Sequence, residues 1–133
     1  MIEVKQFRPG NYLLQKVNNR IVTTTCGLQH FEMMEKGDVK DLYPLVLKAE
    51  LLIKAGFTEN KKYPLLPAAR EFILVLPVQS NQKNEIRAYT TSTGSCFARA
   101  MVEGMPASNP IHHFHQLQNL YLALTGEELQ VSL

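Results

Sequence analysis

Three β-prone runs follow one another in the second half of the chain, and they constrain its fold more than any other feature. The runs are residues 71–79, 85–91 and 95–102, and the first is strongly apolar. Only the turn-like segments 80–84 and 92–94 separate them. Connections this short join antiparallel strands, because a parallel pair needs a long crossover. We therefore predict a β-meander in this part of the chain.

A second antiparallel pair is predicted near the N-terminus. Residues 12–17 and 20–25 are β-prone, and the second run contains the β-branched sequence IVTTT. Asn18 and Asn19 separate the runs, and asparagine tolerates the positive φ of a two-residue hairpin turn. This pattern predicts a β-hairpin. The segment that follows is polar and irregular, and it predicts a short strand at residues 29–33 and then a loop.

A short amphipathic helix is predicted in the middle of the chain, over residues 44–57. Leu47, Leu51 and Ala55 recur at four-residue spacing, which places them on one apolar face. Gly56 is positioned to end the helix in the left-handed conformation, and Phe57 can then fold back onto the helix.

A second amphipathic helix is predicted near the C-terminus. Its apolar residues follow the spacing i, i+3, i+4, i+7 and are Leu117, Leu120, Tyr121 and Leu124. Asn109 and Pro110 are typical of a helix start, so we expect the helix to begin at Pro110 or at Phe114. It should end at Thr125, because Gly126 follows.

These elements predict an α+β fold. An antiparallel sheet, made of the N-terminal hairpin and the β-meander, packs against the short central helix and the C-terminal amphipathic helix. The chain has 133 residues and is 45% hydrophobic, so we expect one domain over residues 1–133 with a substantial core.

Composition excludes several classes of function. The formal net charge is only +2 and the basic residues are scattered, so there is no strong nucleic-acid signal. No apolar run approaches the roughly 20 residues of a membrane helix, and the N-terminus lacks the apolar core of a signal peptide. Cys26 and Cys96 form no CxxC pair and are expected to be free. We expect a cytoplasmic protein with no membrane partner.

Three fragments of the sequence resemble motifs of a known protein family. They are RPGNY at residues 8–12, LKAELLIKAGF at residues 47–57 and HQLQNLYLALTGEEL at residues 115–129. Together they resemble a family of small uncharacterised proteins from Bacteroidetes genomes and their phages or prophages, whose members end in a VHxLQNLYFALTGEEL-like motif. The chain departs from the family at Lys48, where the family has a capping threonine, and at Phe114, where it usually has valine. The resemblance implies a phage-related setting, with the host cytoplasm as the location, and it implies no reaction.

The second turn of the meander is a candidate anion site. Its hydroxyl residues are Thr91, Ser92, Thr93 and Ser95. Backbone amides and hydroxyls in such a turn can hold a phosphate, and Arg87 and Arg99 on the flanking strands would then be the cationic clamps. The segment lacks the GxxxxGK[ST] pattern, so a plain hairpin turn is the alternative.

Three of the four histidines lie close together, at His112, His113 and His115. Zinc needs about four ligands, and only His115 belongs to the motif of the resemblance, so we predict no metal site, although whether the cluster binds metal stays open. We expect His115 to pack at the start of the C-terminal helix. His115 and Asn119 are also candidate ligand-binding residues. The alternative for Gln118 and Asn119 is that their amides satisfy backbone groups of a neighbouring segment.

The sequence carries no catalytic motif and predicts no catalytic residue and no cofactor. Our main hypothesis is a small non-enzymatic binding protein of a phage or mobile element, which engages a host protein or sequesters a ligand. One alternative is a phage counter-defence protein that binds a small, anionic, nucleotide-like signal. Another is a small metal-dependent or Cys/His-dependent hydrolase. The sequence also leaves open whether the protein forms a homodimer.

Overall fold

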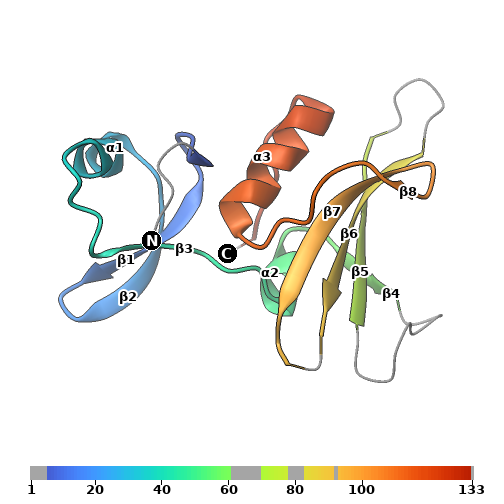
Figure 1. Ribbon diagram of the computed structural model, residues 1–133, viewed down its shortest axis with the longest axis horizontal. Helices are drawn as coiled ribbons and strands as arrows, with labels where there is room; N and C mark the ends of the chain where they lie inside the picture. The colour runs from blue at the N-terminus through green and yellow to red at the C-terminus, as the bar shows by residue number, and fades with distance from the viewer. Residues whose placement is uncertain (1–5, 61–69, 78–82, 92, 133) are drawn as a thin grey trace.

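The computed structural model describes residues 6–60, 70–77, 83–91 and 93–132. Within these ranges the protein has an α+β fold with two antiparallel sheets and three helices, which confirms the predicted class. The N-terminal hairpin and the meander belong to separate sheets, and helix α3 (Phe114–Thr125) lies between them (Figure 1). None of the helices in these ranges is both long and apolar enough to span a bilayer.

The smaller sheet contains the predicted hairpin. Strands β1 (Tyr12–Val17) and β2 (Arg20–Thr25) are antiparallel, and β3 (Leu42–Pro44) pairs with the other edge of β1. Asn18 and Asn19 have φ angles of 52° and 63°, the left-handed pair that a tight two-residue turn requires. The hairpin prediction is therefore confirmed in both strands and in the turn.

The short strand predicted at residues 29–33 was wrong, because this segment forms helix α1 (Leu28–Glu35). His30 is responsible for part of the difference. Its Nδ1 accepts a hydrogen bond from the backbone N–H of Gly27 at 3.0 Å, and its Nε2 lies 2.9 Å from Oε1 of Gln15 on β1. Met34, one turn later, is buried on the same face. The pattern of this polar segment does not distinguish a helix from a strand, and tertiary contacts with β1 decide it here.

The larger sheet contains the meander, with its strands in chain order. The strands are β4 (Thr58–Asn60), β5 (Arg70–Val75), β6 (Asn84–Thr90), β7 (Cys96–Val102) and β8 (Met105–Pro106). All neighbours are antiparallel. The three predicted strands are confirmed, although β5 ends at Val75. The end of the first predicted strand and most of the turn after it, residues 78–82, lie outside the described residues.

The central helix is shorter than predicted. Helix α2 (Ala49–Lys54) begins at Ala49 rather than Pro44, which belongs to β3. The backbone before it is extended, because Leu47 donates to the carbonyl of His112 at 3.0 Å. The predicted end is confirmed: Gly56 has φ of 97°, and the N–H of Phe57 donates to the carbonyl of Leu52.

Helix α3 begins at Phe114, the second of the two predicted starts, and Asn109 and Pro110 do not cap it. Ile111 exchanges two backbone hydrogen bonds with Ala98 on β7, so the chain stays extended past Pro110. Gln116 then accepts hydrogen bonds from the backbone N–H groups of His112 and His113 at the helix start. The predicted end at Gly126, with φ of 75°, is confirmed.

Two buried clusters hold the elements together. The larger one packs α2 and α3 against the inner face of the five-stranded sheet, through residues that include Leu52, Phe72 and Leu117. The smaller one packs α1 against the three-stranded sheet around Leu13. Phe114 belongs to the larger cluster, and its ring meets the ring of Tyr12 on β1 edge to face, at 5.9 Å. Helix α3 thus connects the two sheets.

Candidate functional site

The residues of the predicted anion-binding turn form hydrogen bonds with one another. Thr91 donates its backbone N–H to the carbonyl of Ser95, and Gly94 donates to the carbonyl of Thr91. The hydroxyls of Thr91 and Thr93 lie 2.9 Å apart and bond to each other. Thr91, Thr93 and Ser95 are exposed, and Ser92 lies outside the described residues. This is the bonding of a plain hairpin turn, in which the groups needed for a phosphate are already partly used.

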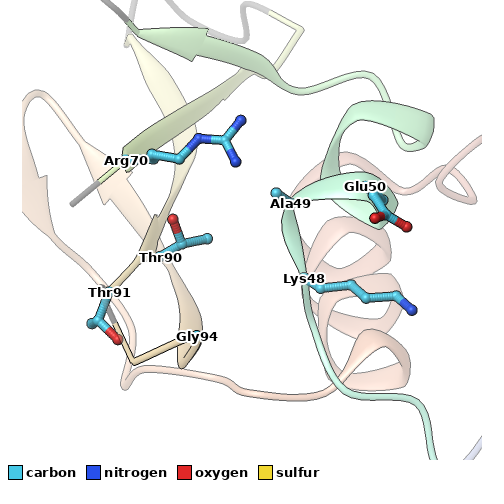
Figure 2. A pocket seen from close by; sticks show the side chains of 7 residues that line it. All are labelled: Lys48, Ala49, Glu50, Arg70, Thr90, Thr91 and Gly94. Atoms are coloured by element: carbon cyan, nitrogen blue, oxygen red, sulfur yellow. The ribbon is translucent and has the colours of Figure 1, made fainter. Parts of the chain in front are cut away.

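A cleft of about 410 Å³ lies beside this turn (Figure 2). Its lining residues are Lys48, Ala49, Glu50, Arg70, Thr90, Thr91 and Gly94. Figure 2 shows Arg70 extending from β5 toward α2, whereas the side chains of Lys48 and Glu50 point away from Thr90 and Thr91. The guanidinium of Arg70 makes two bonds to the carboxylate of Glu59, at 2.7 and 3.0 Å. The cleft therefore offers an anion little net positive charge.

Arg87 and Arg99 lie on the other face of the sheet and do not line this cleft. Side chains alternate along a strand, and on β6 Ile86 and Ala88 point into the core. Arg87 therefore points to the opposite side, which we call the outer face. Arg99 is its cross-strand partner on β7 and shares that face. The two predicted arginines are neighbours, but the structure does not combine them with Thr91.

Arg87 pairs with two buried carboxylates on the outer face. Its Nε lies 2.7 Å from Oε1 of Glu85, and its Nη1 lies 3.8 Å from Oε2 of Glu71. Glu85 is 4% exposed and Glu71 is 7% exposed. Glu71 also accepts a hydrogen bond from Nδ2 of Asn60 at 2.7 Å. Burial, followed by the hydrogen bond to Glu71, raises the pKa of Tyr89, which lies beside this group. Arg87 therefore pairs with side chains of the protein and is not free to bind a ligand.

Arg99 differs from its neighbour, because no carboxylate among the described residues pairs with it. Its guanidinium carbon lies 5.7 Å from the centre of the Phe97 ring, within the range of a cation–π contact. Its Nε is buried and has no hydrogen-bond partner among the described residues. The side chain is half-buried, so the outer face presents a guanidinium that no carboxylate among the described residues contacts directly.

Three rings form a row next to Arg99. Tyr89 and Phe97 are cross-strand partners with ring centres 5.4 Å apart, and the ring of His112 lies 6.5 Å from that of Phe97. The row exists because Ile111 pairs with Ala98, which sets His112 beside Phe97. We call Tyr89, Phe97, His112 and Arg99 the outer-face patch. Aromatic side chains can stack on a planar ring, and a guanidinium can bind an anionic oxygen.

His115 is buried and lies apart from the outer-face patch. Its ring stacks on Phe7 with centres 3.9 Å apart, and its Nε2 lies 3.3 Å from Oε1 of Gln6. The Nδ1 atom is buried without a partner among the described residues. Burial, together with the nearby charge of His113, lowers the pKa of His115 to about 4. As expected, His115 packs at the start of the C-terminal helix.

We predict that His115 makes the protein less stable as the pH falls from 6.5 toward 4. In the unfolded chain the imidazole of His115 binds a proton near pH 6.5, whereas in the folded protein the buried ring binds it only near pH 4. Stability from this group is complete above pH 6.5 and is lost as the pH falls, by about 2–3 kcal/mol. Urea denaturation at several pH values should show a flatter profile for His115→Gln. The matched variant His112→Gln, at an exposed histidine, should follow the wild type, and equal flattening in both variants would contradict the prediction.

Asn119 and Gln118 join α3 to the N-terminal segment. Oε1 of Gln118 accepts the backbone N–H of Tyr12 at 2.8 Å, and Nδ2 of Asn119 donates to the carbonyl of Gln6 at 2.6 Å. Oδ1 of Asn119 accepts from Nε of Arg8 at 2.6 Å. Both amides therefore satisfy groups of a neighbouring segment, which was the alternative to a ligand-binding role.

The same network connects two of the three fragments on which the resemblance rests. Arg8 also pairs with Glu128 at 2.9 Å, and Nδ2 of Asn11 donates to Asn119 at 3.0 Å. Residues 8–12 and 115–129 thus meet in space although more than 100 residues separate them. These residues hold the N-terminal segment against α3.

The cysteines and histidines do not gather into one site. Cys26 belongs to the smaller buried cluster and Cys96 to the larger one. Burial raises the pKa of both thiols, that of Cys96 to about 11, so both are protonated at neutral pH. His112 faces Phe97, whereas His115 faces Phe7. In the part of the chain that the structure describes, no three His, Cys, Asp or Glu side chains are placed to hold a metal ion.

Sequence reasoning missed Tyr89, Phe97 and the aromatic role of His112. The alternation in NEIRAYT and CFARAMV could have placed Arg87 with Tyr89 on one face, and Phe97 with Arg99. The pairing of Tyr89 with Phe97 and the approach of His112 depend on the strand register, which the pattern does not specify. Comparisons of the chain with protein-family models, with curated proteins and with solved structures found no match.

Proposed function

We propose that the protein is a small, non-enzymatic binding protein that holds a nucleotide-like ligand on its outer-face patch. The observation that supports this most is Arg99, a cation without a carboxylate partner among the described residues, next to a row of three rings. The neighbouring carboxylates, Glu71 and Glu85, both contact Arg87, which offsets part of the repulsion that they exert on an incoming anion.

The ligand class follows from the two kinds of group in the patch. Phe97 and Tyr89 offer apolar ring surface for stacking, which is tolerant of the base because every base has a π-face. Arg99 supplies planar donors that suit phosphate oxygens. A ligand with a planar base and a phosphate uses both groups at once. Among the described residues that line the cleft beside Arg70, there is neither an unpaired guanidinium nor an aromatic row.

A binding role is preferred to Cys/His-dependent hydrolysis because neither cysteine thiol is activated. The thiols of Cys26 and Cys96 are buried and protonated at neutral pH. A cysteine nucleophile requires the thiolate, which a nearby base or positive charge normally stabilises.

The proposal predicts nucleotide binding that depends on Arg99. Calorimetric titration with nucleoside mono- and diphosphates, and with cyclic nucleotides, should identify a ligand of the wild-type protein. For that ligand, Arg99→Gln should raise the dissociation constant about 10- to 100-fold, because a hydrogen bond to a charged group contributes about 1.5–3 kcal/mol. Phe97→Leu should weaken binding by a similar factor, since stacking on one base is worth about 1–3 kcal/mol.

The matched control is Arg70→Gln, which removes the guanidinium of the cleft and should leave the dissociation constant unchanged. The reverse result, with binding lost in Arg70→Gln and kept in Arg99→Gln, would assign the ligand to the cleft and overturn the proposal. Absence of binding across the whole nucleotide series would overturn it as well.

The biological setting is proposed from the resemblance alone. Residues 8–12, 47–57 and 115–129 resemble phage- and prophage-associated proteins of Bacteroidetes, so we propose a role in a phage or mobile element inside the host cell. Sequestering a nucleotide-like signal of a host defence system would combine this setting with the outer-face patch. Engagement of a host protein, the other part of our main hypothesis, rests on the same resemblance.

A further inference from the structure

Strand β2 forms one edge of the three-stranded sheet. The strand order is β2-β1-β3, and no described strand pairs with the free side of β2. The strand lies at the end of the molecule far from the five-stranded sheet (Figure 1). Five of its six residues are exposed, including Ile21 at 54% and Val22 at 40%. Ile21 and Val22 point to opposite faces, so β2 carries exposed apolar side chains on both sides.

The hairpin register identifies the backbone groups that point away from β1. Val17 and Arg20 flank the two-residue turn and form the closing hydrogen-bonded pair. Bonding to β1 then alternates along the strand, through Arg20, Val22 and Thr24. The bond from the N–H of Cys26 to the carbonyl of Asn11 continues this alternation. The N–H and C=O groups of the residues between them, Ile21, Thr23 and Thr25, therefore point outward.

This edge lacks the features that usually prevent strands from pairing between molecules. Exposed edges commonly carry lysine, proline or a bulge. Residues 21–25, IVTTT, contain no charge and no proline, and all five side chains are β-branched. The β1–β2 register is continuous from the turn to Thr25, without a bulge. The only charged residue of β2 is Arg20, at its first position.

We propose that the outer edge of β2 pairs with β2 of a second copy of this chain, antiparallel and about a two-fold axis at Thr23. In this register Thr23 faces Thr23 of the second copy, and Ile21 faces Thr25 of the second copy. The outward groups of all three residues then find partners, and the two small sheets become one six-stranded sheet. A two-fold interface of this kind is self-complementary and closed.

The position of Arg20, the only charged residue of β2, supports pairing with a second copy in this orientation. Antiparallel pairing about Thr23 sets the two Arg20 residues at opposite ends of the ribbon, about 20 Å apart at roughly 3.4 Å per residue. This separation exceeds the Debye length of about 8 Å at physiological salt, so the two charges are screened from each other. Parallel pairing would place them side by side.

Sedimentation equilibrium over a range of concentrations tests the proposal. The wild-type protein should form a dimer that dissociates on dilution. Thr23→Lys places two ammonium groups opposite each other across the axis and should give a monomer, as should Thr23→Glu with two carboxylates. An equimolar mixture of the two variants should restore the dimer, because opposite charges then face each other.

The matched control is Thr58→Lys, which adds the same charge to an exposed threonine on β4, the edge strand of the other sheet. This variant should dimerise like the wild type. The circular dichroism spectra of all variants should match, since each change is at the surface. A wild-type protein that stays monomeric overturns the proposal. So does a Thr23→Lys variant that dimerises normally, or a mixture that remains monomeric.

Discussion

Replacing Arg87 with methionine should lower the free energy of unfolding by about 3–5 kcal/mol at neutral pH, the usual cost of leaving a buried charge without its partner. Arg87 lies between Glu71 and Glu85, which are 7% and 4% exposed. Methionine keeps most of the apolar stem and removes the charge, so the effect reports the two carboxylates rather than lost packing. Urea denaturation followed by far-UV circular dichroism measures it.

Arg99→Met is the matched control, because Arg99 occupies the cross-strand position and has no carboxylate partner among the described residues. Its effect on the unfolding free energy should be far smaller. In a Glu71→Gln, Glu85→Gln background the cost of Arg87→Met should also shrink, since the charges that need compensation are gone. Equal losses in Arg87→Met and Arg99→Met would mean that pairing with Glu71 and Glu85 is not what stabilises Arg87.

Replacing Phe114 with alanine should cost about 3–5 kcal/mol of unfolding free energy, as for other fully buried phenylalanines. Phe114 is 0% exposed, and its ring links the larger cluster to Tyr12 on the smaller sheet. The truncation therefore opens a cavity where α3 meets both sheets, and thermal or urea denaturation should show it.

Two comparisons make the Phe114 result specific. Phe114→Leu fills most of the volume and should lose much less stability. Leu124→Ala, at a half-buried position later on α3, should also cost less than Phe114→Ala. If Leu124→Ala is as costly as Phe114→Ala, the start of α3 is not the main connection between the sheets.

Local chemistry explains which predictions from sequence were confirmed. The asparagine pair at residues 18–19 adopts the positive φ that its turn needs, and Gly56 and Gly126 end the two predicted helices in the left-handed conformation. The meander followed from β-prone runs with short connections. Each of these signals lies within a few neighbouring residues, so no distant contact is needed to interpret it.

The predictions that were wrong concern features that depend on contacts between residues far apart in the chain. Helix α1 depends on the contact of His30 with Gln15, and the late starts of α2 and α3 depend on an extended segment that pairs with residues far along the chain. The candidate site shows the same division. The sequence indicated Arg87 and Arg99, but it could not show that buried carboxylates pair with the first, whereas no carboxylate among the described residues pairs with the second.

The sequence by itself thus determined the α+β class, the hairpin, the meander and the C-terminal ends of the two predicted helices, because short-range backbone preferences decide these features. Only the tertiary structure decided which arginine is available for a ligand, and which rings lie beside it. Those properties depend on strand register and on the docking of residues 111–113 against β7. Register and docking arise from long-range backbone pairing and burial, which a local pattern of residues does not specify.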